Sequence, residues 1–204
     1  MVRRMVLWSG LDVWTAEAAR VELNDDGLRA TGTQLGAEQV PYRLDYALDA
    51  TGPGFATRHM RVAAAGEGWR RSIDLLRDDG GGWRCDADAE GDVDLPAPGG
   101  DLSALGPDAL DCDLGLSSLT NLMPIRRHAL HERAGRRDIV VAWISVPDLA
   151  VTIDPQTYEH LRTGVVRFSQ PDGFSADIEV DADGLVLHYP QIARRVRTAP
   201  SDVA

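Results

Sequence analysis

The chain contains no lysine, very little cysteine and no long apolar run. Its 204 residues include 21 basic residues, all of them arginine, against 32 acidic ones, and the formal net charge is −11. Proteins hold nucleic acid and anionic membrane surfaces through basic patches, so we expect no nucleic-acid partner. The two cysteines, Cys85 and Cys112, are too few for a disulfide framework.

No segment reaches the length of a membrane span, and we expect no integral membrane contact. The apolar residues 5–8 are too short for the core of a secretory signal, and Asp12 follows soon after them. These absences predict a cytoplasmic protein with reduced thiols. The length and the 44% hydrophobic content predict a single β-rich domain over residues 1–204, with flexible ends at about 1–4 and 197–204.

The sequence also lacks the motifs of nucleotide binding and of a nucleophile elbow, so we expect no cofactor. Cys112 is a weak nucleophile candidate, because Asp111 and Asp113 on either side raise the pKa of a thiol. Metal sites are not expected, since no Asp-x-Asp pair continues into a calcium loop and the histidines lack zinc spacing. The pairs are 86/88, 92/94, 111/113 and 181/183, and the histidines are His59, His128, His131, His160 and His188.

What the chain does contain is alternation of apolar and polar residues over short segments. The segment 42–49 is typical, with Tyr42, Leu44, Tyr46 and Leu48 facing one way. Turn signals such as Asn24–Gly27 separate the segments at intervals of about ten residues, which predicts an antiparallel sheet, sandwich or barrel. The expected strands are 5–11, 19–23, 28–35, 42–49, 58–65, 69–75, 83–88, 125–132, 139–146, 165–169, 174–180 and 185–189.

A few segments depart from this alternation. The continuous apolar run 139–146 predicts a central strand covered on both faces. Asp154 as N-cap, Pro155 at the first position and Gly164 as terminator predict one short helix. The Pro/Gly-rich residues 96–107 predict a long surface loop.

The stretch 111–128 concentrates the most chemistry, and its residues support two interpretations. Arg126 or Arg127 could point inward and bind an anionic head group, or could form an internal salt bridge with Asp111 or Asp113. Thr120 and Asn121 precede Pro124, which is typical of a helical turn over about 118–123 that ends at the proline. Nine aromatic residues could line a cavity or fill an ordinary core: Trp8, Trp14, Trp69, Trp83, Trp143, Tyr158, Phe168, Phe174 and Tyr189.

Several segments together resemble a known family. They are Leu7-Trp8, Asp111-Cys-Asp, Thr120-Asn-x-x-Pro-Ile-Arg-Arg127, Val140-Val-Ala-Trp-Ile-Ser-Val-Pro147, Gln156-x-Tyr158 and Phe174-x-Ala-x-Ile-x-Val-Asp-x-x-Gly-Leu-Val-x-x-Tyr-Pro190. Over roughly residues 6–196 the chain resembles the bacterial family labelled "putative glycolipid-binding". The resemblance implies a mainly β fold: a strongly curved antiparallel sheet around a helix or cavity, forming a partial or complete barrel with one or two short helices. That fold is similar to the periplasmic lipoprotein carriers.

The leading hypothesis for function is binding of a lipid-like or glycolipid-like molecule in the concave face of the sheet. The expected ligand-binding residues are Asp111, Asp113, Asn121, Arg126, Arg127, His128, Trp143, Tyr158 and Tyr189. A second hypothesis is an enzyme that uses His128, Asp111 and Arg126 in acid and base roles. A third is a structural or interaction protein with a filled core. The sequence does not indicate an oligomeric state.

Overall fold

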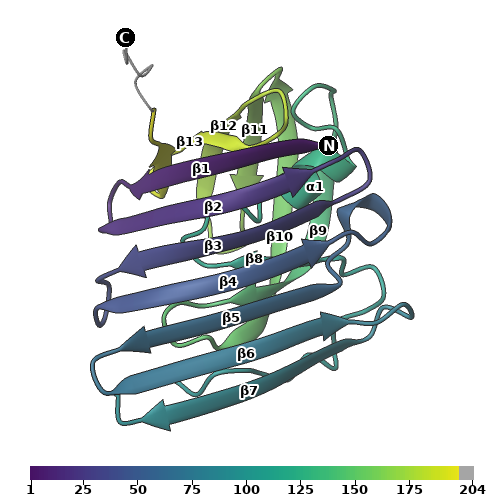
Figure 1. The fold of residues 1–204 in the computed structure, drawn as a ribbon. Coiled ribbons are helices and arrows are strands. Elements are labelled where there is room, and N and C mark those ends of the chain that lie inside the picture. Colours follow the sequence, from purple (N-terminus) through teal and green to yellow (C-terminus); the bar gives the residue numbers. More distant parts are fainter. Residues whose placement is uncertain (198–204) are drawn as a thin grey trace.

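A computed structural model describes residues 1–197, which form one large sheet of 14 strands and a single short α-helix (Figure 1). A 3-10 turn, η1 (Pro53–Phe55), joins two of the strands. The strands are β1 (Val2–Gly10), β2 (Thr15–Leu23), β3 (Leu28–Gly36), β4 (Tyr42–Ala50), β5 (His59–Gly66), β6 (Trp69–Arg77), β7 (Trp83–Gly91), β8 (Asp111–Leu114), β9 (Arg136–Ile144), β10 (Val151–Arg162), β11 (Val165–Ser169), β12 (Ser175–Val180), β13 (Val186–Tyr189) and β14 (Ala193–Arg195).

The strand order is β7-β6-β5-β4-β3-β2-β1-β14-β13-β12-β11-β10-β9-β8. Strands β1 to β7 form a meander, and β14 joins its first strand to the returning half of the chain. Every pair is antiparallel except β8 with β9, which is parallel. Strands β7 and β8 are the two ends of the order, so the sheet is not closed, and of the two predicted forms, a partial or a complete barrel, the partial one is confirmed.

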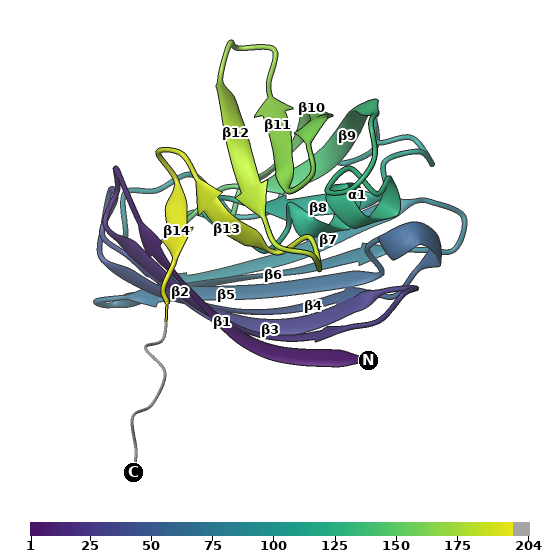
Figure 2. The same ribbon diagram turned by 90° about the horizontal axis from the view of Figure 1, so that it is seen from above.

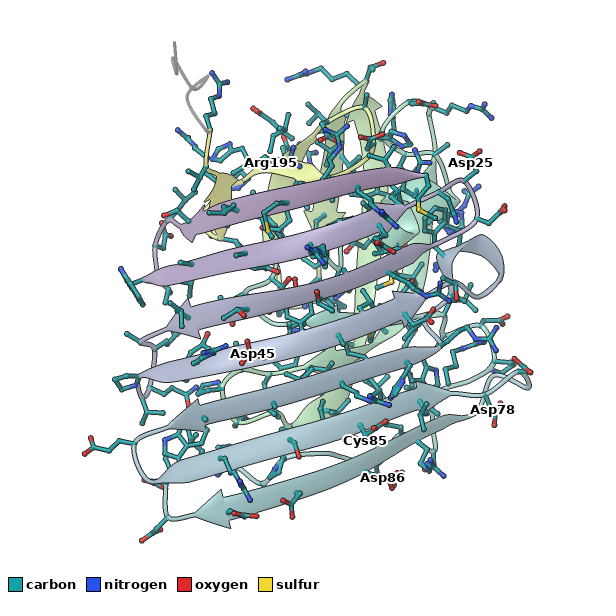
Figure 3. The ribbon with its side chains drawn as sticks, in the orientation of Figure 1. Asp25, Asp45, Asp78, Cys85, Asp86 and Arg195 are labelled. Atoms are coloured by element: carbon teal, nitrogen blue, oxygen red, sulfur yellow. The ribbon has the colours of Figure 1, made fainter. Side chains whose placement is uncertain are left out.

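The alternation in the sequence matches the two faces of the sheet. In β4 the residues Tyr42, Leu44, Tyr46 and Leu48 are buried on the concave face. Asp45 and its outward neighbours lie on the convex face, the face that is viewed in Figure 3. This period of two is why the meander could be predicted strand by strand.

The helix α1 (Leu122–Arg127) lies between the two halves of the sheet (Figure 2). Leu122 and Met123 pack into the apolar core of the large meander. Ile125 packs into a second core, with residues of β10 to β13 such as Tyr158 and Ile178. One short helix therefore contributes to both cores, and the sheet wraps around it.

Two secondary-structure predictions were wrong. Residues 125–132 were predicted as a strand, but α1 occupies their start and a turn follows. Pro124 was predicted to end a helical turn, whereas it lies within the first turn of α1, where its missing N–H has no intrahelical partner to lose.

The helix predicted from Asp154 to Gly164 is also absent, because β10 covers residues 151–162. Pro155 pairs with Val140 on β9 only, since pairing with β11 begins at Thr157. A proline is tolerated where a strand is paired on one side. Gly164 has a φ of +76° and forms the turn into β11. The pairing of β10 with β9 and β11 therefore outweighed the local helix-capping signals in the sequence.

Residues 139–144 of the run lie in β9, which is next to the end of the sheet and not central. Val141, Ala142 and Ile144 are buried, but Val140 is 39% exposed, so the predicted cover on both faces does not hold along the whole run. Residues 96–107 contain no strand, but Leu102 and Leu105 are buried, so this loop is partly a cover for the core. Residues 2–4, predicted as part of a flexible end, belong to β1. The predicted flexible residues 198–204 lie outside the described residues. Over residues 1–197, no helix has the length and apolar character that crossing a membrane requires.

Leu122→Ala should lower the free energy of unfolding by about 3 kcal/mol, because Leu122 is fully buried where α1 meets the large meander. Urea titration followed by circular dichroism measures this change. Leu161→Ala is the matched control, because Leu161 is exposed on β10 and should change stability by less than about 0.5 kcal/mol. Equal losses in both variants would contradict the placement of α1 between the cores.

Candidate functional site

A cavity of about 450 Å³ lies beside the start of α1, and we call it the central pocket. It is formed where the loop 115–121, the turn after β9, the β11–β12 turn and the β3–β4 turn meet. Its lining is Glu38, Gln39, Asp113, Leu114, Gly115, Leu116, Ser117, Asn121, Trp143, Ser145, Val146, Asp148, Phe168, Gln170, Asp172, Phe174, Tyr189 and Ile192. A larger hollow of about 730 Å³ lies outside β9 and β10, but no aromatic residue lines it. The central pocket is the candidate site because it alone combines aromatic walls with clustered polar groups among the described hollows.

A buried polar cluster holds the loop under the pocket. Glu17 on β2 accepts hydrogen bonds from the Ser117 hydroxyl at 2.7 Å and from the Ser118 backbone N–H at 3.1 Å. The Tyr46 hydroxyl also donates to Glu17, at 2.6 Å. Burial raises the pKa of the Glu17 carboxyl, and these three donors oppose that rise. The cluster fastens the pocket loop to the concave face of the large meander.

The neighbouring strand β3 adds a second anchor to the same loop. Gln34, the cross-strand partner of Glu17, donates to the Gly115 carbonyl at 3.3 Å and accepts from the Tyr42 hydroxyl at 2.7 Å. Gly36 stands opposite Tyr42, and a Cβ there would lie 2.4 Å from the tyrosine ring. The absence of a side chain on Gly36 therefore lets Tyr42 lie across β3 and reach Gln34.

Asp113 is the pocket residue with the most unusual electrostatics. It accepts hydrogen bonds from the Thr120 hydroxyl at 2.6 Å and from the Gln156 amide at 2.8 Å. Burial, opposed by these two donors, raises the pKa of Asp113 to about 6. No arginine bonds to it among the described residues, and Gln156 also bonds to Asp154, which places a second carboxylate nearby.

The apolar side of the pocket is aromatic. Phe168, Phe174 and Tyr189 pack against one another, with ring centroids 6.0 to 6.4 Å apart. Trp143 on β9 is half-buried and adds a fourth ring to the lining. The prediction that aromatic residues line a cavity thus holds for these four, whereas Trp8, Trp69 and Tyr158 are buried in the two cores and Trp14 is exposed.

The structure brings four of the nine predicted ligand-binding residues together in the lining of the pocket: Asp113, Asn121, Trp143 and Tyr189. That they bind a ligand stays a prediction. Tyr158 lies just behind them and donates its hydroxyl hydrogen to Asn121 Oδ1 at 3.0 Å. Asn121 is the residue before α1, but its side chain does not cap the helix. Asn121 therefore does not cap the helix, because Tyr158 takes its side-chain oxygen, but the predicted turn before Pro124 is present, since the Leu122 N–H donates to the Leu119 carbonyl at 3.1 Å.

Asp111, Arg126, Arg127 and His128 do not line the pocket. Arg127 forms a bidentate ion pair with Asp111, at 2.6 and 2.7 Å, and also donates to the carbonyls of Gly54 and Phe55. Asp111 is only 2% exposed. The predicted salt bridge therefore exists, and four of the five N–H donors of Arg127 are engaged within the protein.

The proposed acid and base residues do not converge either. Arg126 lies over the Phe55 ring at 5.8 Å. Burial and the neighbouring Arg127 lower the pKa of His128. Within residues 1–197 the His128 ring makes no hydrogen bond to a carboxylate, and Asp111 is occupied by Arg127. The geometry thus gives this trio no shared reaction centre.

Cys112 is not placed to act as a nucleophile. It is 1% exposed, and burial raises the pKa of its thiol to about 12, so almost no thiolate forms at neutral pH. Over the described chain no group of three or more His, Cys, Asp or Glu converges as a metal site. The two carboxylates of the Asp111/Asp113 pair have different partners, because Asp111 binds Arg127 and Asp113 accepts a hydrogen bond from Gln156.

Sequence reasoning missed most of the polar lining. The missed polar residues are Glu38, Gln39, Ser117, Ser145, Asp148, Gln170 and Asp172. All seven of these residues lie in turns or loops, where polar side chains are expected for turn formation alone. No local pattern separates such residues from ordinary turns, because only the tertiary fold brings them together.

The protein is thus an open, curved β-sheet that wraps around one short helix, with an amphipathic pocket beside that helix. The chain belongs to the bacterial family described as "Putative glycolipid-binding", whose profile matches residues 5–195. It is also similar to a DUF1089 family protein from Pseudomonas aeruginosa, whose crystal structure it matches with a TM-score of 0.70 and 27% identity over 88% of this chain and 92% of that chain. No curated protein matches the sequence.

Arg127→Ala should lower the free energy of unfolding by about 3 kcal/mol or more, because it leaves Asp111 buried without its partner. Chemical denaturation measures the loss. Arg126→Ala is the control, because Arg126 has no ion pair among the described residues and should cost less than about 1 kcal/mol. If Arg127→Ala kept full stability, the ion pair would not be a structural clamp.

Asp113→Asn should remove a pH dependence of stability. The folded pKa of Asp113, about 6, lies above its ordinary value of 3.8, so its contribution is fully present below pH 3.8 and is lost as the pH rises through 6. Between pH 5 and pH 7.5 the ionisation of Asp113 should lower the free energy of unfolding of the wild type. The decrease over this range should be about 1 kcal/mol smaller in Asp113→Asn.

Asp45→Asn is the comparison for this experiment. The hydrogen bond from Arg43 lowers the pKa of the exposed Asp45, so this variant should keep the wild-type slope over the same pH range. A wild-type slope in Asp113→Asn would show that Asp113 ionises normally in the folded protein.

Proposed function

We propose that the protein binds a glycolipid-like amphiphile, with the head group in the central pocket. The observation that carries this proposal is the division of the lining into two sides. Phe168, Phe174, Tyr189 and Trp143 provide apolar surface, and carboxylates, amides and hydroxyls provide hydrogen bonds. Sites for small molecules combine these two features, because apolar walls supply affinity and a few polar groups fix orientation.

The size of the pocket supports a head group rather than a whole lipid. Its 450 Å³ is near the lower end of the range of roughly 300–1,000 Å³ for ligand sites. Leu116, Val146 and Ile192 add aliphatic surface to the lining, against which the first part of a chain could pack. The rest of an acyl chain would extend out of the pocket.

The family description names glycolipids and so supports the class of ligand. The proposed site lies beside the two cores, which are packed with the protein's own apolar side chains, so the third hypothesis stays an alternative. The cytoplasmic location stays a prediction, and it would make the ligand an intracellular lipid or a lipid on a membrane surface.

Fluorescence anisotropy with a fluorescent glucosylceramide tests the proposal. The wild type should bind the probe at micromolar concentration or tighter. Phe174→Ala should weaken binding about tenfold, because truncating an aromatic anchor removes its contact area. Trp143→Ala should weaken it to a similar degree.

Trp14→Ala is the matched control for Trp143→Ala, because Trp14 is 65% exposed and does not line the pocket. It should leave the dissociation constant unchanged. Thermal unfolding of each variant shows that the fold is retained. Absence of probe binding to the wild type, or equal losses in Trp14→Ala and Trp143→Ala, would refute the proposed site.

A further inference from the structure

We propose that the head group bound in the central pocket is an uncharged sugar that donates hydrogen bonds, and that the pocket rejects phosphate, sulfate and carboxylate head groups. This inference rests on the proposed function and narrows its ligand. It differs from the sequence hypothesis, in which an arginine meets an anionic head.

The charge of the lining carries the first step. Glu38, Asp113, Asp148 and Asp172 line the pocket, whereas none of its lining residues within the described chain is arginine or histidine. An anionic group in the pocket would face these carboxylates without a cation to offset them. Like charges at close range in a partly buried site cost several kcal/mol, which is enough to exclude an anion.

Two largely buried arginines are already bound within the protein. Arg127 is bound to Asp111. Arg71 is buried on β6 and donates to the carbonyls of Leu95, Pro96 and Asp148. Neither guanidinium lines the pocket, so neither can neutralise a bound anion there.

The hydrogen-bond inventory carries the second step. The Ser117 hydroxyl donates to Glu17, and the Ser145 hydroxyl donates to Asp148. The Gln170 amide donates to Asp154 at 2.7 Å. The donors of these three polar groups are therefore engaged within the protein. The carboxylates of the lining can only accept hydrogen bonds. The pocket is rich in acceptors, and a ligand that fits it must bring the donors.

Sugar hydroxyls satisfy this requirement without a charge. A hydroxyl donates to a carboxylate and still accepts from the Nδ2 amide group of Asn121, whose oxygen is engaged by Tyr158. The half-buried rings of Trp143 and Phe174 offer apolar surface for the C–H face of a pyranose. Phe168, Phe174 and Tyr189 pack against one another, so they do not form an open cage around a quaternary ammonium.

Three amphiphiles with the same octyl chain separate the possible head groups: octyl glucoside, octyl sulfate and octyltrimethylammonium. Isothermal titration calorimetry below the micelle concentration gives a dissociation constant for each. We expect octyl glucoside to bind at least about tenfold more tightly than octyl sulfate and more tightly than octyltrimethylammonium.

Gln39→Arg tests the electrostatic cause directly. Gln39 is exposed on the β3–β4 turn and lines the pocket, and its side chain makes no hydrogen bond within residues 1–197. The added cation should strengthen octyl sulfate binding about fivefold. Thr163→Arg is the control, because Thr163 is exposed in the β10–β11 turn, at the end of β11 away from the pocket. It should leave all three constants unchanged.

The outcomes distinguish this inference from the function on which it rests. If octyl sulfate or octyltrimethylammonium binds the wild type as tightly as octyl glucoside, the inference is wrong and amphiphile binding stands. An equal gain for octyl sulfate in Gln39→Arg and Thr163→Arg also overturns the inference. If none of the three amphiphiles nor the glucosylceramide probe binds, the proposed function itself fails.

Discussion

The ion pair between Asp111 and Arg127 determines where the helix sits, and the two cores depend on that position. Asp111 belongs to β8 and Arg127 ends α1, so their two hydrogen bonds fix the helix against the end strand of the sheet. The same guanidinium binds the carbonyls of η1, which connects β4 to β5. One side chain thereby joins the returning half of the sheet, the helix and the large meander. A buried pair of this kind is costly to break, although it adds little net stability over an apolar pair.

Most of the meander could be predicted, because apolar and polar residues alternate along its strands and most of its turns carry Gly, Asn or Asp. The prediction failed where local signals and long-range pairing disagreed. Pro155 and Gly164 resemble helix punctuation, yet residues 151–162 pair with β9 and β11 over most of their length. Helix propensity is worth tenths of a kcal/mol per residue, and a twelve-residue strand with two neighbours outweighs it. The pairing of β1 with β14 joins residues more than 180 positions apart, and no local pattern encodes it.

The candidate site was predicted in part for a related reason. Asp113, Asn121, Trp143 and Tyr189 lie in segments that the family resemblance singled out, and the structure brings them to one pocket. For Arg126 and Arg127 the sequence allowed either anion binding or a salt bridge. It could not decide between them, because only the fold shows that Asp111 pairs with Arg127. Glu17 shows the same limit. A carboxylate is expected at the surface, yet Glu17 lies on the inward face of β2 with Ala19 and Val21 and holds the loop that forms the pocket.

An unclosed sheet exposes the backbone of its terminal strands, which is a risk for polymerisation. Strand β7 is such a strand, and its outward side chains include Asp86, Asp88 and Glu90 (Figure 3 labels the first of these). A second β7 that approached it edge to edge would bring these carboxylates against their own copies. The acidic residues, which also argue against binding of nucleic acid, therefore disfavour pairing of β7 with a second copy of itself.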